Sequence, residues 1–79
     1  FWLRKRHPRY DDAIAILGFM KKLAEIGNVV GLNFMAGYYE VGIGDLIPKD
    51  IETAVRMYRR SAEQGNQAAK AALKRLKRQ

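Results

Sequence analysis

Apolar residues recur at spacings of three and four along most of the chain, which is the period of a helix with one face turned inward. The pattern predicts four helices, over about residues 12–26, 28–41, 50–64 and 66–78. The glycine-rich stretch VGIGDLIPKD lies between the second and the third helix and predicts one long loop. We therefore expect an all-α fold of antiparallel helical hairpins, stacked as a short α-solenoid.

The apolar stripes assign a buried face to each predicted helix. One stripe is expected on each of three helices: Ala13, Ile16, Leu17, Met20 and Ala24 on the first, Ala54, Val55, Tyr58 and Ala62 on the third, and Ala69, Ala72, Leu73 and Leu76 on the fourth. The second helix has two stripes, one with Gly31, Met35 and Tyr39 and the other with Val30, Phe34, Tyr38 and Val41. A helix that is apolar on most sides is buried on most sides, and we expect this of the second helix.

Two similar segments, LAEIGN at 23–28 and SAEQGN at 61–66, show that the chain repeats itself. Their glycines, Gly27 and Gly65, are 38 residues apart, and the same offset aligns the flanking positions in size and polarity. A period between about 20 and 50 residues is typical of a repeat array. Three aligned pairs also carry helix-end signals: Asp12 and Asp50 as N-caps, Gly27 and Gly65 as left-handed C-terminal residues, and Asn28 and Asn66 as caps of the following helices.

The residues from Gly27 to Asn66 resemble a Sel-1-like repeat, a relative of the tetratricopeptide repeat. The resemblance is carried by Gly31, Met35, Ala36, Tyr39, Gly42, Gly44, Pro48, Asp50, Ala54, Tyr58, Ala62 and Gly65. Gly31 stands where alanine is usual, and two extra residues, Asp45 and Leu46, precede Pro48. With its flanking halves the resemblance covers about residues 12–76, and we assign 11–79 to the helical repeat domain after a basic lead-in, 1–10.

The resemblance implies a scaffold that binds other proteins in a concave groove and has no chemistry of its own. It places the second helix along that groove, so the candidate protein-binding residues are Asn33, Phe34, Gly37, Tyr38 and Glu40. For Phe34 and Tyr38 an alternative is that both pack against the first helix. A stack normally needs about three repeats for stability, so this chain should depend on a partner or on further sequence.

Catalytic and metal-binding patterns are not found. His7 is the only histidine and there is no cysteine. Asp11 and Asp12 are adjacent, so on a helix their side chains point apart. The GIGD segment lacks a preceding strand and the third glycine of a dinucleotide fingerprint, and its glycines suit a tight turn instead. We expect no enzyme, no cofactor, no metal site and no small-molecule substrate.

The net charge of +7 is concentrated at the two ends of the chain. At the N-terminus, FWLRKRHPR offers Trp2, Arg4, Lys5, Arg6 and Arg9 as candidates for a membrane or another anionic surface. Apolar residues followed by basic ones resemble the end of a membrane helix on its cytoplasmic side. A frayed terminus, or a piece of a preceding helix docked on the body, is the alternative.

The basic tail KAALKRLKRQ also has two interpretations. It is either a capping helix, with alanine and leucine on the stack and lysine and arginine outward, or a helix that binds nucleic-acid phosphates. The low aromatic content favours the cap. In the middle of the chain, Arg56, Arg59 and Arg60 form a basic patch, and we expect local ion pairs with Glu52 and Glu63 there.

These observations predict a non-catalytic protein–protein interaction adaptor, a small subunit of a larger assembly that is associated with a membrane, with the domain on the cytoplasmic side. The alternative function is a basic module that binds an anionic membrane surface or nucleic acid through its charged ends.

Overall fold

The computed structural model describes residues 10–77. They form four helices, α1 (Tyr10–Glu25), α2 (Val29–Val41), α3 (Ile51–Glu63) and α4 (Gln67–Lys77). The described residues contain no β-strand, and one isolated antiparallel bridge joins Ile43 to Ile47. The predicted all-α fold is confirmed, and every helix begins and ends within two residues of the expected positions. No helix in this part of the chain is long and apolar enough to cross a membrane.

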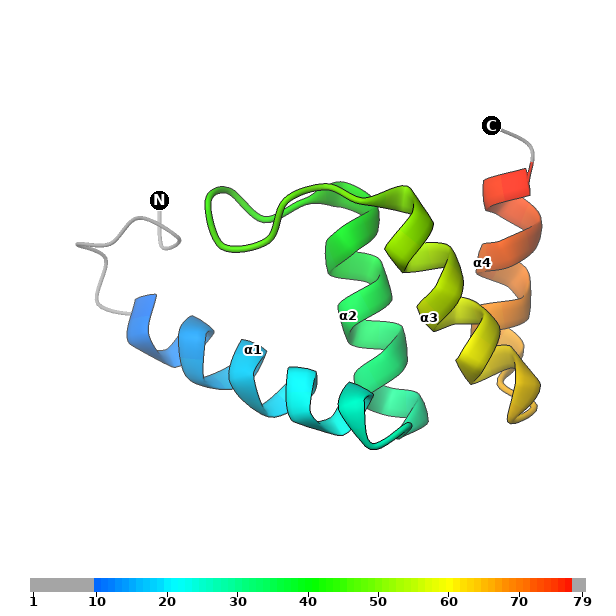
Figure 1. Cartoon of the computed structure of the whole chain (residues 1–79), viewed down its shortest axis with the longest axis horizontal. Helices are drawn as coiled ribbons and strands as arrows, with labels where there is room; N and C mark the ends of the chain where they lie inside the picture. The colour runs from blue at the N-terminus through cyan, green and yellow to red at the C-terminus, as the bar shows by residue number, and fades with distance from the viewer. Residues whose placement is uncertain (1–9, 78–79) are drawn as a thin grey trace.

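Helices that follow one another in the chain also pack against one another in space. α2 packs on α1 and on α3, and α3 packs on α4. In Figure 1, α2, α3 and α4 stand side by side and alternate in direction, while α1 leaves the lower end of α2 at a wide angle. The arrangement is a stack of helical hairpins with α2 and α3 at its centre.

The short turns that join α1 to α2 and α3 to α4 have the same geometry. Gly27 and Gly65 both have a positive φ, 81° and 92°, which is the left-handed conformation that glycine adopts without steric cost. The Gly27 N–H donates to the Ala24 carbonyl oxygen at 3.0 Å, and the Gly65 N–H donates to that of Ala62 at 2.8 Å. In each turn the following asparagine N–H reaches the carbonyl five residues earlier. These bonds satisfy the last carbonyl groups of α1 and α3.

Three of the four predicted N-caps are confirmed. The Asn28 side chain accepts from the N–H groups of Val30 and Gly31, and Asn66 Oδ1 accepts from the Ala69 N–H at 2.8 Å. Asp50 Oδ1 accepts from the Thr53 N–H at 3.1 Å. Thr53 Oγ1 also donates to Asp50 Oδ2, at 2.7 Å, and this bond and the one from the Thr53 N–H lower the pKa of the Asp50 carboxyl below its ordinary value.

The prediction for Asp12 is wrong, because α1 already begins at Tyr10. Asp11 and Asp12 both lie inside its first turn. Carboxylates there still interact favourably with the positive end of the helix dipole.

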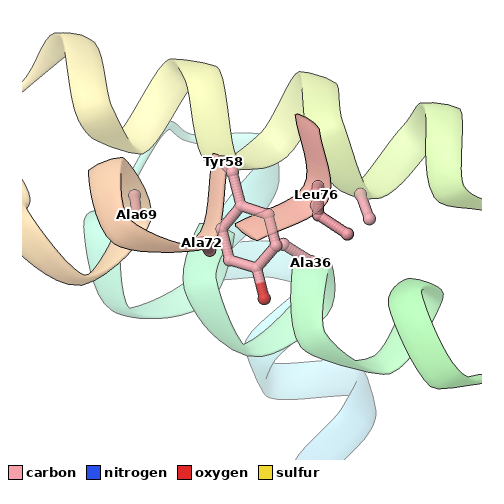
Figure 2. Packing of buried hydrophobic residues seen from close by; sticks show 6 residues of the cluster. Ala36, Tyr58, Ala69, Ala72 and Leu76 are labelled. Atoms are coloured by element: carbon pink, nitrogen blue, oxygen red, sulfur yellow. The ribbon is translucent and has the colours of Figure 1, made fainter. Parts of the chain in front are cut away.

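The core consists of two clusters. The first joins α2, α3 and α4 through Ala36, Ala54, Tyr58, Ala69, Ala72 and Leu76. Figure 2 shows the Tyr58 side chain reaching from α3 toward Ala36 and Ala72, and the small alanine side chains allow the three helices to approach closely. The second cluster joins α1 and α2 through Ala24, Leu32, Met35 and Ile47. Ile47 comes from the long loop, where Gly42 and Gly44 have positive φ, so the loop forms part of the core.

Two expectations about buried faces are wrong. Ile16, placed on the core stripe of α1, is 52% exposed. The second stripe of α2 is also largely outside the core, because Val30, Phe34 and Val41 are 52%, 45% and 66% exposed. The physical reason is that α1, α3, α4 and the loop, which all contact α2, leave this side of the helix open.

The expected ion pairs of the middle arginines are not present either. Within residues 10–77 the one salt bridge joins Glu40 to Arg75. Arg56 instead donates from Nη2 to Thr53 Oγ1 at 3.1 Å. At the end of the chain, α4 buries Ala69, Ala72 and Leu76 and leaves Lys70, Lys74 and Lys77 exposed, which is the arrangement expected of a capping helix.

Candidate functional site

A groove that the sequence did not define lies between α2 and α4. Helices α2 and α4 form its walls and Tyr58 of α3 lies at its base. We call it the α2–α4 groove. It is an open hollow of about 510 Å³, lined by Asn33, Tyr58, Ala68, Ala71, Ala72 and Arg75.

Three of the five candidate residues of α2 lie at this groove. Asn33 lines it directly. Gly37 lies beside its base, since a β-carbon built at Gly37 would be 3.8 Å from Tyr58 Oη. Glu40 binds Arg75, which is itself a lining residue. A glycine and two alanines, Ala68 and Ala71, leave the backbone of both walls accessible to an extended chain.

Glu40, Tyr58 and Arg75 form a hydrogen-bonded network at the groove. Arg75 binds both carboxylate oxygens of Glu40, with Nη2 donating to Oε1 at 3.0 Å and Nη1 to Oε2. Tyr58 Oη also donates to Oε1, at 3.1 Å. Glu40 is 15% exposed and Arg75 is 52% exposed. The guanidinium therefore presents part of its charge to solvent while the carboxylate is mostly covered.

The network changes the ionisation of its members. The hydrogen bond from Arg75 lowers the pKa of Glu40 below its ordinary value of 4.5, against the opposing effect of burial, and the bond from Tyr58 lowers it further. Burial raises the pKa of Tyr58 above 10.0, and donation to Glu40 raises it further. At neutral pH the network thus contains a carboxylate, a neutral phenol and a guanidinium cation, held in one arrangement.

A second polar contact joins the two walls. Asn33 Nδ2 donates to Asn66 Oδ1 at 3.0 Å, and the same oxygen caps α4. Asn33 Oδ1 is buried without a hydrogen-bond partner among the described residues. A buried amide oxygen of this kind is suited to accept a hydrogen bond, because leaving it unpaired costs free energy.

Phe34 and Tyr38 point away from this network. Tyr38 is partly buried and packs against the cluster shared by α1 and α2. Its position therefore agrees with the alternative prediction, packing against the first helix. Phe34 is 45% exposed and meets Tyr38 edge to face, with ring centroids 6.2 Å apart. The five candidates of α2 therefore divide into a groove set, Asn33, Gly37 and Glu40, and an aromatic pair on the side of α1.

The half of the groove that α4 supplies was not predicted from the sequence. The signal was present in the internal offset of 38 residues. This offset carries Val30, Asn33 and Gly37 of α2 onto Ala68, Ala71 and Arg75 of α4. The three α4 residues and Asn33 line the groove, and Gly37 lies beside its base. The two walls are thus equivalent positions of two similar hairpins.

The N-terminal candidates, Trp2, Arg4, Lys5, Arg6 and Arg9, lie outside the described residues. Among the residues that are described, no three His, Cys, Asp or Glu side chains gather as a metal-ion site would require. The residues that line the groove offer one guanidinium cation, one amide group and small side chains. No protein-family model, curated protein or solved structure matches the chain.

Proposed function

We propose that this protein is a non-catalytic adaptor that holds an extended segment of another protein in the α2–α4 groove, as a subunit of a larger assembly. The observation that carries the proposal is that the two groove walls come from α2 and α4, which are related by the internal offset of 38 residues. Small residues at Gly37, Ala68 and Ala71 let a peptide backbone approach both walls. The amide of Asn33 and the guanidinium of Arg75 supply polar groups for it.

The resemblance of the chain to Sel-1-like repeats supports the same proposal, because it implies an adaptor that binds other proteins in a concave groove. The shared geometry of the turns at Gly27 and Gly65 is what two successive repeats should show. The partner would be bound mainly by shape and by hydrogen bonds to its main chain. The half-exposed Arg75 favours an acidic side chain or a carboxylate at one end of the bound segment.

A crosslinking experiment tests this proposal. A small photoreactive diazirine side chain is placed at Ala71, on the groove, and in a matched control at Arg56, an exposed position of α3 that does not line the groove. We expect a discrete protein adduct from native extract at Ala71 and none at Arg56, unchanged by nuclease treatment. Equal labelling from the two positions would contradict groove binding.

The second candidate function is binding of an anionic surface by the basic ends. Its support is the row of exposed lysines on α4, Lys70, Lys74 and Lys77. If the basic ends bind nucleic acid, the Ala71 adducts should disappear with nuclease. If they bind an anionic membrane, the chain should sediment with anionic vesicles at low salt and be released at high salt. Retention in the supernatant under both conditions would remove this alternative.

A further inference from the structure

A second hollow lies between α3 and α4 and shares no lining residue with the α2–α4 groove. We call it the α3–α4 pocket. It has a volume of about 190 Å³ and is lined by Val55, Arg59, Leu73, Leu76 and Lys77. Leu76 is buried in the first core cluster, and Val55 and Leu73 pack against that cluster. The apolar base of the pocket is therefore held in place by the core.

Two exposed cations flank this apolar base, Arg59 on α3 and Lys77 on α4. Neither takes part in a salt bridge among residues 10–77. An adjoining hollow shares Val55 and Arg59 with the pocket and adds the cation of Arg56 and the carboxylate of Glu52. The surface around the pocket thus has more cations than carboxylates, and it is complementary in charge to an anionic occupant.

The size of the pocket decides what kind of occupant fits its apolar base. Pockets that bury a drug-sized ligand have volumes of about 300–1,000 Å³, whereas an apolar cavity of about 150 Å³ holds one benzene molecule. At about 190 Å³ the α3–α4 pocket therefore accommodates one aromatic or branched aliphatic side chain. A single large side chain that fills a pocket is typical of the centre of a protein–protein interface.

Three other occupants are less suited to the pocket. Residues 1–9 and 78–79 contain basic side chains and no Asp or Glu, so they do not complement its cations. A second copy of the chain carries the same net charge of +7 and repels the first. A lipid bilayer is entered by protruding apolar side chains, whereas the apolar side chains here line a hollow.

We propose that the α3–α4 pocket binds an acidic segment of a partner protein. One large apolar side chain of this segment fills the space between Val55, Leu73 and Leu76, and carboxylates on either side of it pair with Arg59 and Lys77. The partner is thus recognised by its charge together with one apolar anchor. The pocket is separate from the α2–α4 groove, and the inference does not rest on the function proposed for that groove.

Three synthetic peptides test the inference on the full chain, at an ionic strength of about 0.1 M, where charges interact over about 10 Å. Acetyl-EDEFEDE-amide has both the anchor and the carboxylates, EDEAEDE lacks the anchor, and QNQFQNQ lacks the charge. We expect EDEFEDE to bind with a dissociation constant of about 1 mM or tighter, and each of the others at least about fivefold more weakly. The chemical-shift changes should centre on the methyl groups of Val55, Leu73 and Leu76.

Two double variants locate the charged part of the site. Arg59→Gln combined with Lys77→Gln should weaken binding of EDEFEDE at least about fivefold. Lys70→Gln combined with Lys74→Gln makes the same change in net charge at positions that do not line the pocket, and it should change the affinity less than about twofold. All four side chains are exposed, so both double variants should fold.

Filling the pocket tests its apolar part independently. Val55→Phe places an aromatic ring in the hollow and keeps both cations, so it should weaken binding of EDEFEDE at least about tenfold. Thermal unfolding shows whether this variant is folded. If it is not, the two double variants still decide the question.

Four results would overturn the inference. The first is the lack of saturable binding of EDEFEDE up to about 5 mM. The second is equal binding of EDEFEDE and EDEAEDE, or an equal loss of affinity in the two double variants. The third is a dimer of the chain that the Arg59 and Lys77 substitutions dissociate, which would assign the pocket to a second copy. The last is sedimentation with anionic vesicles, lost in the same variant, in place of peptide binding.

Discussion

Glu40 of α2 and Arg75 of α4 form an ion pair across two helices that do not follow one another in the chain, and Tyr58 of the helix between them donates to the same carboxylate. The two charged residues are 35 positions apart. The pair therefore links the two walls of the groove and depends on the stack being assembled. It connects the stability of the fold directly to the shape of the candidate binding site.

The first prediction concerns the pH dependence of stability. The folded state has a pKa for Glu40 below the ordinary value of 4.5, so its carboxyl binds protons less readily than in the unfolded chain. The stabilisation by Glu40 is therefore complete at pH values well above 4.5 and is lost as the pH falls through the lower pKa of the folded state. Thermal unfolding of the wild-type chain and of Glu40→Gln between pH 3 and 7 measures this contribution.

At neutral pH we expect Glu40→Gln to lower the unfolding midpoint by a few degrees at most, since solvent screens the half-exposed Arg75. The difference between the two proteins should decrease toward low pH. A difference that is independent of pH would show that the charge of Glu40 does not contribute.

The second prediction compares two helical glycines. A β-carbon at Gly31 would lie 2.5 Å from the Ala24 backbone nitrogen, whereas nothing lies within 4 Å of one at Gly18. Gly31→Ala must push α1 and α2 apart and should destabilise the protein by about 1–3 kcal/mol or more. Gly18→Ala should stabilise it by about 0.5–1 kcal/mol, because alanine favours the helix. Thermal unfolding of both variants distinguishes the two effects, and equal changes would contradict the close approach of α1 and α2 at Gly31.

The third prediction separates binding from folding at Gly37. A β-carbon there would meet only Tyr58 Oη, at an ordinary contact distance of 3.8 Å. Gly37→Ala should therefore keep the fold and raise its stability by about 0.5–1 kcal/mol. The added methyl group should reduce adduct formation at Ala71, because a bound backbone could no longer approach α2 closely. Unchanged adduct formation together with higher stability would place the binding site elsewhere.

The fourth prediction concerns Ser61, which is fully buried in α3. Its hydroxyl oxygen has no hydrogen-bond partner among the described residues. An unpaired buried hydroxyl costs about 1–3 kcal/mol, so Ser61→Ala should raise the free energy of unfolding by about 1 kcal/mol. Equilibrium denaturation measures the change. If the variant is instead less stable than the wild type, the hydroxyl has a partner in solution.

The helices and their ends could be read from the chain because the interactions that form them are local. Asn28, Asp50 and Asn66 cap helices through bonds to residues two or three positions away. Gly27 and Gly65 adopt the left-handed conformation that ends α1 and α3. Asp12 was misplaced because a carboxylate in the first helical turn and one at the cap are both favourable, and composition does not distinguish them.

The buried faces of the helices could be predicted from the sequence only in part. The spacing of Ala13, Ile16 and Leu17 predicts an apolar side of α1, but that side is wider than the surface that α2 covers. Ile16 is thus exposed although its residue type suits the core. The groove was predicted for the α2 side alone, through Asn33, Gly37 and Glu40, because the approach of α4 to α2 depends on how both helices pack with α3.

The sequence by itself therefore determined the helices, the turns between them and the repetition of one hairpin pattern, since each depends on neighbours within a few residues or on a comparison of the chain with itself. The tertiary structure decided which apolar stripe is covered, that the loop contributes Ile47 to the core, and that Arg75 pairs with Glu40. The physical reason is that these features depend on the angles and distances between whole helices. Those are set by the side chains of several helices packing together, not by any one segment of the chain.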